Sequence, residues 1–470
     1  MTSQRPLLGC AAVAVLATLT ALPLAAQTLA VQLVDPAGRA SLMNERGDVV
    51  GSHFSYPCTV PGTCIPVTEP SVWLAAGGRK VLPSIGTMPV AAAAIAADGT
   101  VIGSVTDFAT ASKAVVWRLV GGAYTATDIG NLGLQQASAT GIDASGRVVG
   151  YATTPFVSTR PFVWTAGGGM LDLAAAGAPA ERIFSVSPGG RVLTDRFTFL
   201  LDNPAAAQPL PAPPAGPPSF LPTYGANFLA NDSGDLAGFN VTVSEAFYSL
   251  WRWQAASGTW QQLYPVAVKA GSGIPVAVGR INNQSTIGAT VGNALTAQGP
   301  SGLATTVADR LSPAYPPNAL QGNLYFSDQG VILTNIAIGG VSRAAKLVPI
   351  EACTGPCLRV PAITMTGTVV RSPRRGGCGQ AQCTKVVASV TVTDANGNPM
   401  SNTTVGARFM NSYTLDVAAT ARTNASGVAT FTQLGYVGQG TVSMVVESAS
   451  RAGWVFDRGV GKLTAEVIPR

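Results

Sequence analysis

The stretch DASGRVVG, residues 143–150, recurs in varied form along the first three quarters of this chain. The phrases read NERGDVVG (44–51), AADGTVIG (96–103), DASGRVVG (143–150), SPGGRVLT (187–194), NDSGDLAG (231–238), NNQSTIGA (282–289) and SDQGVILT (327–334). Their fourth place is glycine, except for Ser285, and successive fourth places lie 44 to 52 residues apart. A period of this size is typical of arrays of small β units. We therefore predict an all-β fold whose first domain has seven repeated units.

A second phrase, centred on an aromatic or apolar strand, follows most glycine phrases. These phrases read PSVWL (70–74), KAVVWRL (113–119), RPFVWTAGGGMLDL (160–173), RFTFLLD (196–202), YSLWRWQ (248–254) and AAKLVPI (344–350), with a weak counterpart in ALTAQ (294–298). Glycine supplies the positive φ that a tight hairpin turn needs. Alternation along the second strand turns its Trp or Phe toward a neighbouring sheet. We expect Trp73, Trp117, Trp164 and Trp251 to form the core between units.

One such unit cannot bury both faces of its sheet, so the units must stack. Stacking around an axis leaves only short edges, which predicts a β-propeller-like domain over residues 28–350. We expect strands near 30–35 and 48–54, and residues 30–34 complete the last sheet near 344–349. The Pro-rich segment 203–222 is expected to run outside the sheets. Segment 299–318 is interpreted as a connector.

The pattern from Asp143 to Leu173, D-x-x-G-x-V-V-G followed by P-F-V-W-x-x-G-G-G-M-x-D-L, resembles the HAF repeats of bacterial extracellular proteins. The resemblance covers about residues 30–350 and is weakest in the units that carry Phe199, Ser285 and Lys346. It implies propeller-like sheets. It attaches no reaction to the chain, because this repeat marks an architecture and not an activity.

The pattern of apolar runs and turn signals changes after the last repeat. Strands that alternate, such as VTVTD and TVSMVVE, are divided by turn signals about ten residues apart, which predicts a sandwich of about seven strands over 359–470. The phrases V-T-D-x-N-G-N-P and T-x-x-x-G-V-A-T-F, around Asp394 and Gly427, resemble the bacterial Ig-like domain of the invasin and intimin type. The run Asp394 to Asn398 is interpreted as a turn whose aspartate caps its own backbone rather than as a calcium loop.

The first 26 residues have the order of a secretory signal peptide. Arg5 supplies a positive start, an apolar run follows, and Ala25 and Ala26 offer a cleavage site. A retained membrane anchor is the alternative. No second apolar stretch of spanning length follows, so we predict a secreted protein, extracellular or periplasmic, with no membrane span in the mature chain. A formal net charge of +6 over 470 residues is too dilute to indicate nucleic-acid binding.

Six cysteines lie beyond the signal peptide, and they fall into three close pairs: Cys58 with Cys64, Cys353 with Cys357 and Cys378 with Cys383. An even count in an exported chain predicts disulfides, and we expect nearest neighbours to pair. The pair Cys353 and Cys357 falls in a linker, residues 351–358, between the two domains. The rival interpretation is a four-cysteine metal site made by the last two pairs, which their uneven spacing disfavours.

The sequence offers little for catalysis. The chain has one histidine, His53, and no nucleophile elbow, HExxH, P-loop or dinucleotide fingerprint. The turn-phrase aspartates are expected to bond backbone amides; they are Asp98, Asp143, Asp232, Asp235 and Asp328. We predict no cofactor, no metal and no catalytic residue. Ligand stacking is expected at Trp253 or Trp260, in a longer, irregular unit.

Three functions stay open on these grounds. The first hypothesis is a non-enzymatic, exported binding, adhesion or surface-display protein with a glycan or an extracellular protein as partner. The second is a propeller-type polysaccharide hydrolase or lyase with an Ig-like accessory domain, which would need two carboxylates at the mouth of the central opening. The third is a structural component of the cell envelope.

Overall fold

The structure of the chain is a computed structural model. It describes the following residues: 28–55, 58–60, 63–64, 67–86, 89–107, 111–154, 159–211, 228–242, 247–263, 268–269, 276–283, 285–291, 294–298, 304–312, 315, 320–338, 341–350, 353–371, 382–411, 416–436 and 441–469. The predicted signal peptide, 1–26, lies outside these ranges. The regular secondary structure of the described part is almost entirely β-strand, as predicted, with one short helix, α1 (Val307–Arg310).

The described residues up to 350 form a series of small antiparallel sheets, each running from an innermost to an outermost strand. In that order the first four sheets are β2 (Gly38–Met43), β3 (Val49–Ser55), β6 (Val67–Trp73) and β7 (Arg79–Val81); β8 (Val90–Ile95), β9 (Val101–Asp107), β10 (Ala111–Val120) and β11 (Ala123–Asp128); β12 (Gln136–Ile142), β13 (Val148–Thr153), β14 (Thr159–Thr165) and β15 (Gly169–Asp172); β16 (Ile183–Val186), β17 (Arg191–Thr194), β18 (Phe197–Leu200) and β19 (Asn203–Pro209).

The series continues with β20 (Phe228–Ala230), β21 (Leu236–Thr242), β22 (Phe247–Gln254) and β23 (Thr259–Gln262), with β24 (Val268–Lys269) beside β22; β25 (Val276–Ile281), β26 (Ile287–Val291), β27 (Ala294–Gln298) and β28 (Ala304–Thr306); and β29 (Leu320–Phe326), β30 (Ile332–Ile338), β31 (Val341–Ile350) and β1 (Thr28–Asp35). A separate hairpin joins β4 (Cys58–Val60) to β5 (Thr63–Cys64).

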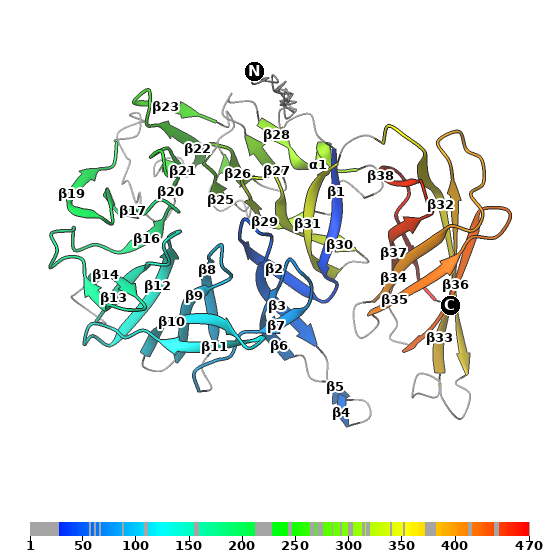
Figure 1. The fold of residues 1–470 in the computed structure, drawn as a ribbon, viewed down its shortest axis with the longest axis horizontal. Coiled ribbons are helices and arrows are strands. Elements are labelled where there is room, and N and C mark those ends of the chain that lie inside the picture. The colour runs from blue at the N-terminus through cyan, green and yellow to red at the C-terminus, as the bar shows by residue number, and fades with distance from the viewer. Residues whose placement is uncertain are drawn as a thin grey trace, which may run out of the picture.

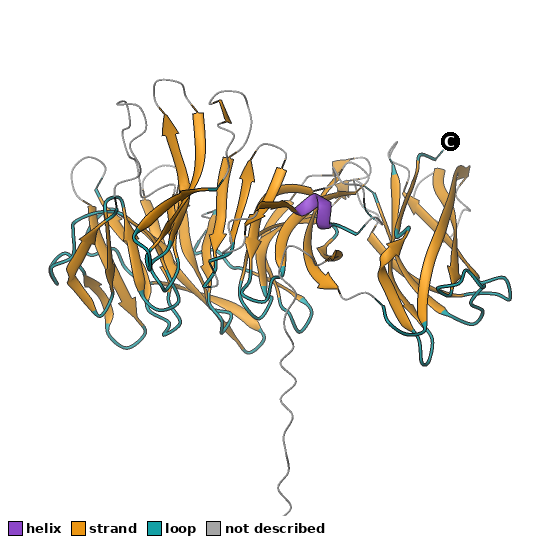
Figure 2. Ribbon diagram, turned by 90° about the horizontal axis from the view of Figure 1, so that it is seen from above, coloured by secondary structure: helices purple, strands orange, loops and turns teal. Residues whose placement is uncertain are grey.

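These sheets follow one another around a common centre (Figure 1). Innermost strands of successive sheets lie against each other in the order β2, β8, β12, β16, β20, β25 and β29, and β29 lies against β2 again. Each seam between sheets is filled by apolar side chains, such as Ile102, Val148 and Phe162 between the sheets of β9 and β13. The arrangement is a β-propeller-like repeat fold (Figure 2).

The beginning and the end of this region share one sheet. β1 is the outermost strand beside β31, and its register runs from Thr28 opposite Ile350 to Leu33 opposite Ala345. The sequence prediction that residues 30–34 complete the last sheet is therefore confirmed. Since three strands of that sheet come from one end of the region and one from the other, strand pairing ties the two ends together.

Each glycine phrase makes the turn between the innermost strand and the second strand of its sheet. In each phrase the N–H of the first residue donates to the carbonyl of the fifth, as Asn44 does to Asp48. The N–H of the fourth residue donates to the carbonyl of the first, as Gly47 does to Asn44. The same two bonds recur in all the phrases. The glycines at the fourth place have positive φ, from 76° at Gly330 to 90° at Gly99. Ser285 takes the same conformation, with φ 57°.

A second glycine constraint escaped the sequence analysis. The eighth place of the phrase lies opposite a bulge in the innermost strand, where a carbonyl oxygen turns toward it. A Cβ on Gly51, Gly103 or Gly150 would lie 1.9, 2.1 and 2.0 Å from the carbonyl oxygens of the bulged strands. No side chain fits at that distance, so these glycines are held by close approach and not by φ.

Several expectations need correction. The Pro-rich segment 203–222 begins as β19, because an outermost strand bonds its sheet on one side only and tolerates prolines there. Segment 299–318 is more than a connector, since it supplies β28 and α1. Of the four tryptophans expected in the core, Trp251 is only half-buried, while the others are buried.

The remaining residues form two four-stranded sheets that pack face to face. One contains β36 (Val428–Tyr436), β33 (Gln382–Thr393), β32 (Cys357–Arg371) and β38 (Val455–Gly461); the other contains β35 (Asp416–Arg422), β34 (Thr404–Met410), β37 (Val442–Ser450) and β39 (Thr464–Val467). Phe409 and Phe431 meet between the sheets with ring centroids 5.9 Å apart. Alternate residues face this core in strands such as β33, which is the pattern that predicted a sandwich, whereas β37 buries five consecutive residues.

The sandwich packs directly against the repeat region. Arg458, from β38, donates a 2.8 Å hydrogen bond to the carbonyl of Val31 in β1. Arg343, from β31, is 2% exposed and donates to the carbonyls of Pro36 and Asn411. Burial lowers the pKa of Arg343 to about 10, against nearby carboxylates that favour its charged form. Arg343 thus stays charged near neutral pH while it bridges both parts of the molecule.

We expect Gly190→Ala to destabilise the protein more than Gly146→Ala. The two glycines have matching φ, 84° and 80°, so both variants incur about 1–2 kcal/mol of backbone strain. A Cβ at Gly146 meets nothing, whereas one at Gly190 lies 2.8 Å from Arg147, whose guanidinium is bonded to Asp143 and Asp202. Shifting the guanidinium weakens these charged hydrogen bonds, which it makes through Nε and Nη1, and adds up to about 1 kcal/mol. Equal urea midpoints for the two variants would show that the neighbouring guanidinium has no part in holding the turn.

Candidate functional site

The glycine-phrase turns gather at one end of the ring, and we call them the turn ring: residues 44–48, 96–100, 143–147, 187–191, 231–235, 282–286 and 327–331. In this ring the second residue of one turn reaches the next turn. Asp232 accepts a 2.5 Å bond from the Gly189 N–H and receives a 2.8 Å bond from the Asn283 amide. Asn283 N–H donates to Asp328, and Asp328 N–H donates to Glu45. Hydrogen bonds therefore run from turn to turn across the seams between sheets.

Two further seams are bridged as well. Asn44 donates a 2.8 Å bond to the carbonyl of Ala96, and Ala144 N–H donates a 2.9 Å bond to the carbonyl of Pro188. Ser285, which replaces the fourth-place glycine, donates its hydroxyl to Asp235 of the neighbouring turn. The serine thus accepts a less favourable backbone conformation and gains a bond that glycine lacks.

The turn-ring aspartates accept backbone N–H groups, as predicted. Asp98 accepts from Thr100, Asp143 from Ser145 and Arg147, and Asp235 from Ala255. Asp232 and Asp328 accept from residues of neighbouring turns. These carboxylates therefore fix the conformation of the turns and the contacts between them.

Asp48 was not singled out by the sequence analysis, although its carboxylate is buried in the turn ring. Burial pushes the pKa of Asp48 upward. Hydrogen bonds from the Ala75 N–H and from the Asn44 and Arg46 side chains outweigh burial and hold the pKa below its ordinary value of 3.8. The bond to Ala75 also ties this turn to the hairpin that closes its own sheet.

The structure supplies an orienting carboxylate for the single histidine. His53 Nδ1 lies 2.7 Å from Asp35 Oδ2, and the Asp35 side chain is buried while that of His53 is 21% exposed. The other Asp35 oxygen accepts the Ala37 N–H. Asp35 ends β1 and His53 lies in β3, so this pair joins the last sheet to the first. Sequence analysis missed it because the contact depends on strand register: His53 lies opposite Gly38, which follows the turn after Asp35.

Trp253 and Trp260 lie directly opposite each other on β22 and β23. Their ring centroids are 5.5 Å apart and the rings are tilted by 56°. Both are half-buried and pack against Leu193 and Leu210 of the preceding sheet. We call this pair the tryptophan patch. In the same hairpin, the hydroxyls of Ser257 and Thr259 bond each other at 2.7 Å.

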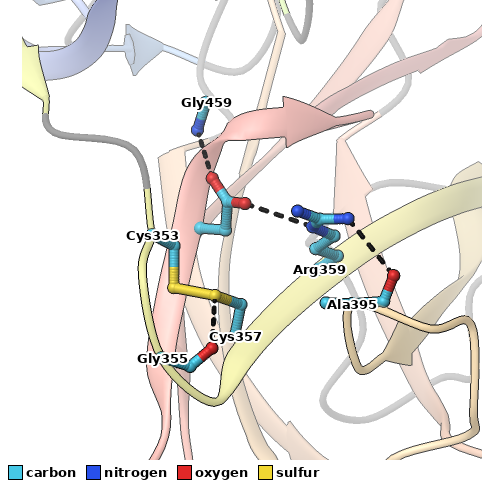
Figure 3. Close-up of a disulfide and its surroundings, with 7 residues drawn as sticks. Cys353, Gly355, Cys357, Arg359, Ala395 and Gly459 are labelled. Atoms are coloured by element: carbon cyan, nitrogen blue, oxygen red, sulfur yellow. Dashed lines mark hydrogen bonds and ion pairs between the residues drawn. A yellow bond between two sulfur atoms is a disulfide. The ribbon is translucent and has the colours of Figure 1, made fainter.

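One predicted disulfide is confirmed. Cys353 and Cys357 are bonded across the turn that begins β32, close to Arg359 and Gly459 (Figure 3). Arg359 bonds Asp457 of β38, so the disulfide sits where the sandwich edge is fastened. Cys58 lies directly opposite Cys64 in the hairpin of β4 and β5. The structure does not describe their side chains, so this disulfide stays a prediction. Cys383 lies in β33, and Cys378 is outside the described residues, so their pairing stays a prediction.

The turn at Asp394 has the form expected from its sequence. Asp394 Oδ1 accepts 2.8 Å bonds from the N–H groups of Asn396 and Asn398, and its other oxygen accepts the Asn398 side-chain amide. These bonds, first that of the Asn398 amide, lower the pKa of the carboxyl. The carboxylate caps its own turn.

Comparison with known proteins gives weak structural likenesses only. TolB from Acinetobacter baumannii is 13% identical with a TM-score of 0.31; the match covers 70% of this chain and 64% of TolB, so this chain spans slightly less than two thirds of that protein. A protein from Lactobacillus plantarum is 11% identical (TM-score 0.32, 63% and 96% covered), and fructan 1-exohydrolase IIa from Cichorium intybus is 8% identical (0.25, 95% and 92%). Likenesses at this level assign no activity. No family model matches the sequence, and no curated protein matches it either.

A helix must be long and apolar to cross a membrane. Among the residues that the structure describes, no helix has the length and apolar character to cross a membrane.

We expect acid to destabilise the protein partly through Asp48. Because its folded pKa lies below the ordinary 3.8, Asp48 contributes stability above that pH, and the contribution is lost as the pH falls through the folded value. Asp48→Asn should cost about 1–3 kcal/mol at neutral pH and flatten the loss of unfolding free energy between neutral pH and about pH 2. Urea titrations across this range measure both, with the exposed Asp128→Asn as control. An unchanged pH profile in Asp48→Asn would contradict the assignment.

Proposed function

We propose that the chain is an exported, non-enzymatic binding or surface-display protein. In this proposal the repeats form a seven-bladed propeller of the HAF type, closed by β1. An Ig-like sandwich of the invasin and intimin type is appended to it. Residues 1–26 direct export, to the periplasm or the cell exterior, and leave no membrane span in the mature chain. The partner is a glycan or an extracellular protein.

The use of the turn-ring carboxylates supports this proposal most. Glycoside hydrolysis needs one carboxyl that gives up a proton and one that stays free to attack or activate water. Asp232, Asp235 and Asp328 instead accept hydrogen bonds from backbone amides or from a serine hydroxyl. Removing them from these bonds would break the links between neighbouring turns, so the ring favours rigidity over proton transfer.

The tryptophan patch is the surface we assign to the ligand. Two tilted indole rings present aromatic faces to apolar C–H groups, and the hairpin that carries them also holds the hydroxyls of Ser257 and Thr259. An aromatic platform of this kind suits the apolar face of a sugar ring. Packing against Leu193 and Leu210 fixes the rings before the ligand arrives, which lowers the entropy cost of binding.

We expect Trp260→Ala to weaken glycan binding at least about tenfold, the usual loss when a central aromatic contact is removed. A glycan array probed with the mature protein identifies the ligand, and titration calorimetry compares the variants. Trp454→Ala, a half-buried tryptophan of the sandwich, is the matched control and should bind normally. Absence of any glycan or extracellular protein ligand, or unchanged binding by Trp260→Ala, would contradict the proposal.

A polysaccharide hydrolase or lyase is the second candidate, and His53 is the observation that favours it. A half-exposed imidazole held at Nδ1 by a buried carboxylate has the arrangement of a general base, because its Nε2 is oriented for proton transfer. The structural interpretation of the same pair is a link between the first and last sheets. A structural component of the cell envelope is a third candidate, which shares the rigid ring.

Activity assays separate these candidates. If His53 is a base, His53→Gln should lower release of reducing or unsaturated ends from a polysaccharide panel by a factor of about 10² to 10⁴ while the fold is kept. If the pair is structural, the wild-type protein releases none, and His53→Gln lowers only its melting temperature. Catalysis that His53→Gln leaves unchanged would remove His53 from any mechanism.

A further inference from the structure

The outer edge of β35 is an open side of the sandwich. β35 ends the sheet order β35-β34-β37-β39, and it pairs with β34 from Thr404 opposite Arg422 to Met410 opposite Asp416. Within the described ranges, no strand pairs with its other side. Such an edge presents backbone N–H and C=O groups that a further strand can complete.

Most other edges carry features that hinder strand addition. β7, β15 and β23 have three or four residues, and β19 contains Pro204 and Pro209. β38 carries Gly459 and Gly461 and has a register shift beside β32. β35 has seven residues, no Pro or Gly, and a continuous register with β34. It therefore lacks the devices by which proteins protect exposed edges.

The sequence of β35, DVAATAR (416–422), is complementary to itself in the antiparallel direction. A two-fold axis through Ala419 sets Asp416 opposite Arg422 of a second copy, and the same pair recurs at the other end. Between these charges the opposed residues are small or β-branched, Val417 with Ala421 and Ala418 with Thr420. Opposite charges directly across two strands are favourable, and small residues let the strands approach. β11 and β36 are also open edges, but neither has charges placed in this way.

The two charged groups are accessible for such a pair. The Asp416 side chain is 40% exposed and shares one oxygen with Arg408 at 2.8 Å. Arg422 is exposed and donates to the side-chain oxygen of Asn402 at 3.2 Å. A carboxylate accepts several hydrogen bonds and a guanidinium donates five, so each can add a partner without losing its present one.

We propose that two copies of this chain associate through β35, related by a two-fold axis through Ala419. The two sheets then join into one, in the order β39-β37-β34-β35-β35-β34-β37-β39, and main-chain hydrogen bonds supply affinity while the paired Asp416 and Arg422 fix the register. The occupant of this edge is a second copy, because the complementarity is that of the strand with itself. The dimer presents two propellers, which raises avidity for a repeated ligand.

Sedimentation equilibrium of the full mature chain tests this association. We expect a monomer–dimer equilibrium with a dissociation constant in the micromolar range, weakened by salt. Arg422→Asp places like charges opposite each other at both ends, and should raise the dissociation constant at least about tenfold. The exchanged variant, Asp416→Arg with Arg422→Asp, restores opposite charges and should recover the dimer. Arg451→Asp, another exposed arginine of the sandwich, is the matched control and should behave as wild type.

Unfolding in urea checks that every variant is folded. A wild-type chain that stays monomeric up to near-millimolar concentration would overturn the proposal. Dimerisation that Arg422→Asp leaves intact would overturn it too, since association would then use another surface. Failure of the folded exchanged variant to recover what Arg422→Asp loses would equally contradict the pairing.

Discussion

The repeated turn at the inner end of each sheet is the constraint on which the rest of the ring depends. Each turn closes with the same two backbone hydrogen bonds and places its fourth residue at positive φ. Because the geometry repeats, the second residue of each turn arrives at the same place relative to the next sheet. Side chains at this place, such as Asp232 and Asn283, can then bond from turn to turn. The conformation of each turn thus also determines how neighbouring sheets are spaced.

Basic side chains from neighbouring units lie against the turn glycines, in the seams between sheets. A Cβ on the turn glycine would meet Arg46 at Gly99, Arg147 at Gly190 and Lys346 at Gly47. The missing side chain of glycine therefore provides both backbone freedom and room for a cation from the neighbouring unit. Burial lowers the pKa of Lys346, whose ammonium donates to the carbonyl of Gly47 across the seam between the last and first sheets. Together with β1 and the pair of Asp35 and His53, this bond holds the seam where the chain begins and ends.

The sequence carried much of this architecture because glycine and tryptophan mark it directly. Gly146 and its equivalents locate the turns, and Trp117 and Trp164 locate the third strands of their sheets. The pairing of β1 with β31 followed from the expectation of a closed ring. Innermost strands such as VAAAAI (90–95) were missed, since short Ala-rich runs have weak β-propensity and no aromatic marker. The pair of His53 and Asp35 depends on the register of β2 with β3, and the cross-seam bonds depend on ring closure; residue spacing reveals neither. A strand at 203–209 was missed because prolines argue against sheet, although an outermost strand tolerates them.

Closure of the ring by β1 is the central claim, and hydrogen exchange measured by mass spectrometry tests it most directly. If β1 completes the last sheet, the amides between 28 and 35 that bond β31 exchange as slowly as those of β30 and β31, and all three strands become exposed together when the domain unfolds. If amides from 28 to 35 exchange at the rate of an unstructured peptide while β30 and β31 stay protected, the ring is not closed in this way and the claim is wrong.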